Sequence, residues 1–212
     1  MLKVIGTALL TAFATSMFWI WFYNFASTGP SAANRTVSPA GQQVTVDPKN
    51  QPPVSIAEGL VVGPAGLALP VQGIKPDQLV DTYTQARAGG ARRHDAIDIM
   101  AGEGTPVLAA ADGKVEKLFF SDGGGGITVY VRSPDGQWIY YYAHLKDYAP
   151  GLREGQRIER GARLGSVGTT GNANVAGPHL HFAVHQMSPG ESWHEGTPVN
   201  PYPLLAGEGR GG

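Results

Sequence analysis

The alternation of apolar and polar residues is clearest in the stretch 177–185, GPHLHFAVH. Side chains of a β-strand point alternately to opposite faces, so Leu180, Phe182 and Val184 would share one face of a strand. That face is apolar throughout, which predicts contact with a hydrophobic core. The opposite face carries an alanine and three histidines: His179, His181, Ala183 and His185. The pattern therefore predicts a strand that presents a row of imidazoles to something other than the core.

Short apolar runs separated by glycine- and proline-rich turns continue this β character through residues 59–206. Four strand-like segments precede the histidine strand: 105–120, turning at Asp112-Gly113; 127–132; 137–145; and 157–167, turning at Arg160-Gly161. The first and last would each form a hairpin. Residues 133–136, SPDG, are a turn signal between the middle two, because proline presets φ and glycine permits positive φ. The pattern predicts a mainly β domain, built as an antiparallel sheet or sandwich.

The N-terminal segment differs from this domain. Val4 to Ala26 contains no charged residue over 23 positions, and as a helix these would span about 35 Å, enough for the hydrocarbon core of a membrane. We therefore predict a single transmembrane anchor at residues 1–26, with Lys3 on the cytoplasmic side and the rest of the chain outside. The alternative is a cleaved signal peptide, whose apolar region is usually shorter, about 7–15 residues.

Two further segments have the composition of unstructured chain. Residues 27–58 are rich in Ser, Pro, Gly, Asn and Gln, which predicts a flexible linker. Residues 207–212, GEGRGG, predict a disordered glycine-rich tail. The four-glycine run at 123–126 has no strand-to-helix context, so it predicts a mobile loop rather than a phosphate cradle.

Charge and cysteine content narrow the chemistry. A net charge of −1 gives no general attraction to nucleic acid, so no nucleic-acid partner is expected. The absence of cysteine excludes a thiol nucleophile, a disulfide framework and any cysteine-bound zinc. The candidate chemistry therefore falls on histidine and aspartate.

A second histidine-containing segment is RRHDAIDIM, residues 92–100. Imidazole and carboxylate together suit zinc, so His94 and Asp98 are candidate ligands. In a straight strand their Cα atoms would be roughly 13 Å apart, and one ion could bind both only if the chain bends near Ala96. Taken alone, this segment is better explained as an exposed loop in which the pair is incidental. In the segment 137–145, simple alternation places His144 on the same face as Trp138, Tyr140 and Tyr142.

The order of these motifs resembles the LytM/lysostaphin-type zinc endopeptidases. The resemblance covers roughly residues 65–204 and lies in H-x-x-x-D (94–98), Tyr-Ala-His-Leu (142–145) and Gly-Pro-His-Leu-His-Phe (177–182). Further matching segments are GTPV (104–107), ADGKV (111–115) and GARLG (161–165) with Gly171. One departure is visible, because the family usually has glycine where Ala96 stands.

The resemblance implies a bound Zn²⁺ with His94, Asp98 and His181 as ligands, and His144 and His179 as unliganded catalytic histidines. It also implies peptidoglycan peptides as substrate, in an enzyme of the bacterial cell membrane whose catalytic domain faces the extracytoplasmic side. Two alternatives stay open. The domain could be a non-catalytic LytM-like module that binds and activates another cell-wall hydrolase, which would be a regulatory partner in the envelope. Zinc could instead clamp the fold, with His144 or His179 as a fourth ligand.

Overall fold

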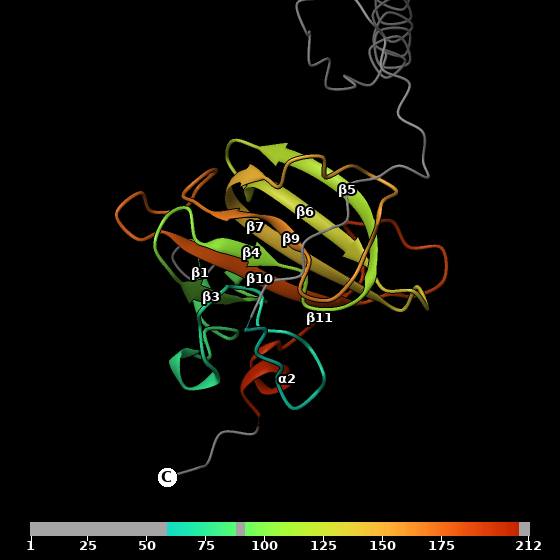
Figure 1. The fold of residues 1–212 in the computed structure, drawn as a ribbon, viewed down its shortest axis with the longest axis horizontal. Coiled ribbons are helices and arrows are strands. Elements are labelled where there is room, and N and C mark those ends of the chain that lie inside the picture. The colour runs from blue at the N-terminus through green and yellow to red at the C-terminus, as the bar shows by residue number, and fades with distance from the viewer. Residues whose placement is uncertain (1–58, 88–91, 208–212) are drawn as a thin grey trace, which may run out of the picture. The chain divides into compact units, whose positions relative to one another are not determined.

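The computed structural model describes residues 59–87 and 92–207, and Figure 1 shows their fold. The predicted anchor (1–26), the predicted linker (27–58) and all but the first residue of the predicted tail lie outside the described residues. Within the described residues, no helix is long and apolar enough to cross a membrane. The elements are, in chain order, η1 (Pro76–Gln78), β1 (Ala86–Arg87), β2 (Arg92–Arg93), β3 (Ile97–Met100), β4 (Pro106–Leu108), β5 (Gly113–Ser121), β6 (Gly126–Arg132), β7 (Trp138–Tyr148), β8 (Arg157–Ile158), β9 (Arg163–Val167), β10 (His179–Gln186), β11 (Thr197–Val199) and α2 (Tyr202–Ala206).

One antiparallel sheet of nine strands is the dominant element of this part of the chain, which confirms the prediction of a mainly β domain. Its strand order is β11-β10-β7-β6-β5-β8, with β3 paired to β10, and β9 paired to both β4 and β7. The long strands β5, β6 and β7 lie side by side and curve together (Figure 1). Their sequences are rich in β-branched and aromatic residues, which fit a pleated, half-buried surface.

Of the predicted hairpins, only the one around residues 133–136 is confirmed. There β6 pairs with β7, the Ser133 N–H donates to the Trp138 carbonyl at 2.9 Å, and Gly136 has a φ of 75°. The prediction for 105–120 was wrong, because β4 pairs with β9 and β5 with β6. The prediction for 157–167 was wrong in the same way, since β8 pairs with β5 and β9 with β4 and β7. In both places long-range strand pairing replaces local pairing.

The core confirms the alternation predicted for the histidine strand. Leu180 and Phe182 on β10 are fully buried, and Val184 is 1% exposed. They belong to a cluster that includes Leu145 on the adjacent strand β7 and Val129 on β6, the next strand along. Burying side chains of this size contributes about 1.5–3 kcal/mol each. This face holds β10 in register, so the histidines of β10 must project from its opposite face.

Strand β7 departs from simple alternation at His144. Val129 of β6 lies opposite Tyr142, but Ile127 lies opposite Leu145, so β7 contains one extra residue at this point. His144 has a φ of 60°, a conformation that costs a non-glycine residue of order 1–3 kcal/mol. The predicted shared face was therefore wrong for His144: Tyr142 is buried in the core, whereas the bulge turns His144 toward β10.

Candidate active site

Strands β3 and β10 bring the two histidine-containing segments together. They pair antiparallel, with Asp98 directly opposite His181. His94 precedes β3, and the chain bends before the strand begins, with a φ of 55° at Asp95. The bend needed to bring His94 near Asp98 is therefore present. Ala96 is 1% exposed and does not adopt positive φ, which explains why alanine is accommodated at this position.

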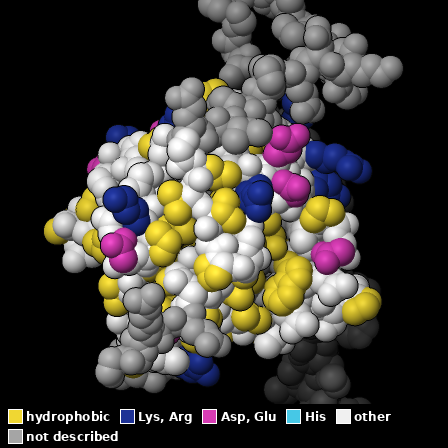
Figure 2. All heavy atoms as spheres, turned by 60° about the horizontal axis from the view of Figure 1, so that its bottom comes forward, with side chains coloured by type: hydrophobic (Ala, Val, Ile, Leu, Met, Phe, Trp, Pro, Cys, Tyr) yellow, Lys and Arg dark blue, Asp and Glu magenta, His cyan; other side chains and the backbone are white. Residues whose placement is uncertain are grey.

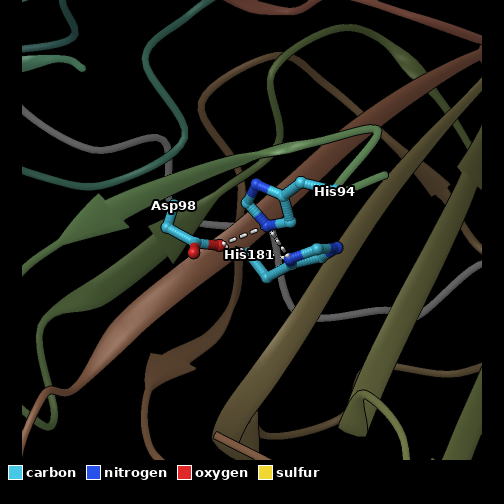
Figure 3. A group of neighbouring side chains, drawn as sticks. All are labelled: His94, Asp98 and His181. Atoms are coloured by element: carbon cyan, nitrogen blue, oxygen red, sulfur yellow. Dashed lines mark hydrogen bonds and ion pairs between the residues drawn. The ribbon is translucent and has the colours of Figure 1, made fainter. Parts of the chain in front are cut away.

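Three potential ligand atoms converge at this point (Figure 3). His94 Nε2 lies 2.9 Å from Asp98 Oδ1 and 3.0 Å from His181 Nδ1. His181 Nδ1 lies 3.2 Å from Asp98 Oδ1. Two imidazole nitrogens and one carboxylate oxygen are a donor set suited to zinc, whereas calcium and magnesium prefer oxygen donors. The three residues could therefore hold a divalent metal ion of the zinc type.

Thr82 holds two members of this group and was missed by sequence reasoning. Its carbonyl accepts a hydrogen bond from His94 Nδ1 at 2.9 Å, and its hydroxyl accepts one from the Asp98 backbone N–H at 3.0 Å. Because a carbonyl can only accept, His94 carries its proton on Nδ1, which leaves the Nε2 lone pair directed at the convergent group. A lone threonine 12 residues before the motif gives no recognisable sequence signal.

His144 and His179 lie beside the convergent group. His179 Nε2 is 3.8 Å from Asp98 Oδ1, and the His144 ring centroid is 5.0 Å from that of His179 and 5.6 Å from that of His181. His144 Nδ1 donates to the Thr170 carbonyl at 2.9 Å, and His179 Nδ1 donates to the Gly177 carbonyl at 2.8 Å. Both rings therefore keep an unprotonated Nε2 when neutral.

Burial and hydrogen bonding set the ionisation of this site. Burial raises the pKa of Asp98, but hydrogen bonding and electrostatic interaction with His181 and His94 outweigh it, so that pKa lies well below its usual range. Burial lowers the pKa of His144 to about 4, and it also lowers the pKa of His181. At neutral pH the carboxylate is thus charged and these two imidazoles are neutral, which are the forms that bind metals and accept protons.

A row of aromatic rings leads away from His181 across β7 and β6. The Tyr141 ring lies 5.8 Å from the His181 ring and 4.5 Å from Tyr130, and Tyr130 lies 4.6 Å from Trp193. Trp193 in turn lies 5.4 Å from Phe119. Alternation along 137–145 places Tyr141 on the face opposite to Tyr142. It does not show that this face carries His144 as well, because the bulge at His144 breaks the alternation.

A surface cavity lies elsewhere on the domain. A cavity of about 780 Å³ is lined by residues at the start of β5, the end of β6 and β8, among them Lys114, Arg132 and Arg157, and by none of the site residues. The face in Figure 2 shows hydrophobic side chains among scattered Lys, Arg, Asp and Glu, and no described histidine is visible on it. The convergent group therefore lies neither in this cavity nor on the face shown in Figure 2.

Comparison with known proteins places these residues in a family. The sequence profile described as Peptidase family M23 matches residues 92–201, a range that contains the convergent group and both neighbouring histidines. The catalytic domain of lysostaphin from Staphylococcus simulans is a similar solved structure, with 30% sequence identity and a TM-score of 0.51. The similarity covers 60% of this chain and 90% of that domain.

Two curated relatives are similar over the same part of the chain. The L-Ala–D-Glu endopeptidase of Bacillus subtilis is 34% identical over 130 residues, which is 58% of this chain and 38% of that protein. The cell division protein DipM of Caulobacter vibrioides is 34% identical over 126 residues, which is 59% of this chain and 19% of that protein. The chain thus spans well under half the length of these two relatives.

Proposed function

The chain belongs to peptidase family M23, and from this premise we propose that it is a zinc-dependent endopeptidase that cleaves peptide bonds in bacterial peptidoglycan. The observation that carries the proposal is the convergence of His94, Asp98 and His181, with two further histidines alongside. A peptidoglycan substrate is supported by the names of similar proteins, among them the Bacillus subtilis enzyme above and a peptidoglycan DD-endopeptidase of Vibrio cholerae.

In this proposal His94 Nε2, Asp98 Oδ1 and His181 Nδ1 hold the zinc ion. The donor atoms already lie within 4.8 Å of one another, so binding requires little rearrangement of the backbone. Zinc supplies Lewis acidity, which polarises a carbonyl group and lowers the pKa of water toward neutrality. Among the described residues only these three form such a group, which favours an open catalytic site over a structural site closed by a fourth side chain.

His144 and His179 are the proposed proton-transfer groups. Each donates from Nδ1 to a backbone carbonyl, so Nε2 is the nitrogen that can accept or donate a proton during the reaction. One imidazole can take the proton of the attacking water, and an imidazolium can protonate the leaving amine or stabilise the oxyanion. The position of the bound substrate decides which histidine accepts the proton of water and which donates to the leaving amine.

We place the domain on the extracytoplasmic side of the bacterial membrane, held by an anchor at residues 1–26. A flexible linker of the length of residues 27–58 has a root-mean-square reach of roughly 30 Å, which suits a substrate at a distance from the membrane. Fusions of alkaline phosphatase after residue 58 should be active in intact cells, and cytoplasmic fluorescence of a matched reporter fusion would contradict this orientation.

The alternative, a module that activates another cell-wall hydrolase, does not require a metal-binding group or proton-transfer histidines. All five residues are present, and the three proposed ligands converge, so we favour catalysis. Metal analysis of the purified protein separates the two ideas. Stoichiometric zinc is expected for the enzyme, whereas metal-free protein that activates a second hydrolase would support the module.

The direct test compares muropeptide release from purified sacculi by the wild-type protein and by His181→Ala. Loss of a proposed ligand should reduce release to the background of the assay. His185→Ala is a matched control, because His185 lies on the same face of β10 but outside the convergent group. Undiminished release by His181→Ala would refute the proposed metal role.

A further inference from the structure

His144 reaches the site only because its backbone is strained. Its φ of 60° and the extra residue in β7 turn the ring away from the core face and toward His179 and His181. A residue in the left-handed region tends to relax unless its surroundings hold it there. The contacts that hold His144 are therefore part of the machinery of the site.

Two hydrogen bonds restrain His144 directly. Its backbone N–H donates to the Gly125 carbonyl at 2.7 Å, and its Nδ1 donates to the Thr170 carbonyl at 2.9 Å. The first restrains the peptide and the second restrains the ring and its tautomer. Both acceptors lie in loops, so they can hold His144 only if the loops themselves are held.

The Thr170 hydroxyl supplies this support. It donates to the Leu145 carbonyl at 2.7 Å and accepts the Ile127 backbone N–H at 2.9 Å. Ile127 and Leu145 lie opposite each other on β6 and β7, immediately beside the bulge. A bulge interrupts the ladder of backbone hydrogen bonds, and a hydroxyl can act as donor and acceptor at once. The Thr170 hydroxyl therefore links β6 and β7 beside His144, where the bulge interrupts their backbone hydrogen bonds.

Glycines allow the two loops to pack closely around Thr170. Gly126 has a φ of 65°, and a Cβ there would collide with Thr170. Gly171 has a φ of 72°, and a Cβ there would collide with the backbone of Gly124 and Gly126. The Asn172 N–H also donates to the Gly124 carbonyl at 2.9 Å. Gly124 and Gly126 of the glycine run thus pack closely against residues 170–172.

We propose that Thr170 is a positioning residue: its hydroxyl locks the loop whose carbonyl holds the His144 imidazole in one orientation and one tautomer. The proposal rests on the proposed peptidase function for its effect on rate, but its effect on His144 is independent of it. Thr170 belongs to neither the convergent group nor the aromatic row. Its loss should therefore lower kcat, while zinc content and KM stay close to those of the wild type.

The test uses the full-length zinc-loaded protein and three variants. Thr170→Val removes the hydroxyl at nearly constant volume, Thr170→Ser keeps it, and Thr169→Val is the control, since the Thr169 hydroxyl makes no hydrogen bond within the described part of the chain. For cleavage of a dimeric muropeptide, kcat should fall roughly 10–100-fold in Thr170→Val, a part of the 10²–10⁴-fold that a positioned general acid or base contributes. Thr170→Ser and Thr169→Val should stay within about threefold of wild type.

A spectroscopic measurement keeps the test independent of activity. Nitrogen-15 NMR of histidine-labelled protein should show His144 as the Nδ1–H tautomer in the wild type and in Thr170→Ser, and as a mixture in Thr170→Val. An inactive wild type would refute the peptidase function but leave this comparison decisive for Thr170. If Thr170→Val does not fold, Thr170→Ala removes the same oxygen. An unchanged tautomer in the hydroxyl-free variant, or a loss of kcat that serine does not restore, would overturn the proposal.

Discussion

Thr82→Val removes one support of the convergent group while His94, Asp98 and His181 themselves stay unchanged. Valine matches the shape of threonine but cannot accept the Asp98 backbone N–H, which lies 3.0 Å from the Thr82 hydroxyl. Thr82 is 8% exposed, so water does not readily replace the lost acceptor. An unsatisfied buried donor costs about 1–3 kcal/mol. For a domain of this size, about 2–4 °C per kcal/mol translates this into a fall in Tm of roughly 2–12 °C.

The same change should weaken metal binding, because it removes one of the hydrogen bonds that fix Asp98 relative to His94. Outer-sphere partners of this kind typically contribute 10–100-fold to metal affinity. Thermal unfolding of the metal-free protein gives the stability, and competition with a chromogenic chelator gives the zinc affinity. Thr82→Ser, which keeps the acceptor, is the matched control. Wild-type values of both Tm and zinc affinity in Thr82→Val would refute the assigned role of this hydroxyl.

Three further predictions test the chemistry and the core. A strong chelator should abolish muropeptide release and added Zn²⁺ should restore it, whereas Mg²⁺ and Ca²⁺ should not, since two of the three donors are nitrogens; activity that survives metal removal would contradict the mechanism. Burial lowers the pKa of His144 from 6.5 to about 4 on folding, so its neutral form is favoured in the folded state. Stability is therefore lost as the pH drops from 6.5 to 4, by about 3 kcal/mol at most. Urea unfolding of metal-free protein at pH 7 and pH 4.5 measures this, and His144→Gln should show a smaller pH dependence than the wild type. Phe182→Ala should lower the free energy of unfolding by about 3–5 kcal/mol, because the side chain is fully buried, while Phe120→Ala, 57% exposed, should change it by about 0.5 kcal/mol or less.

Under the proposed function, the aromatic row beside the convergent group is a candidate surface for contact with substrate. The aromatic row from Tyr141 through Tyr130 to Trp193 begins at the His181 ring and runs across neighbouring strands. Rings in this arrangement offer a continuous apolar surface with polar phenol groups. Substitution of Tyr141 should therefore alter how substrate is held without removing a proposed metal ligand.

The sequence by itself determined the features that depend on local order. Alternation along residues 179–186 identified the buried face of β10, because the side-chain period of a strand is a property of the backbone alone. The order of the motifs identified the family, which comparison confirmed. It also named five candidate site residues, and the structure brings all five into one region.

Tertiary structure decided what depends on contacts between distant segments. Strands β4 and β9 pair with each other instead of forming local hairpins, because long-range burial outweighs turn propensity. The bulge at His144 reversed the face that alternation assigns to this residue, and only the pairing of β6 with β7 reveals it. The supports of the site, the hydroxyls of Thr82 and Thr170, lie 16 and 25 residues from the backbone groups that they bind. Such hydrogen bonds leave no local pattern, since they exist only when the fold brings the two segments within about 3 Å.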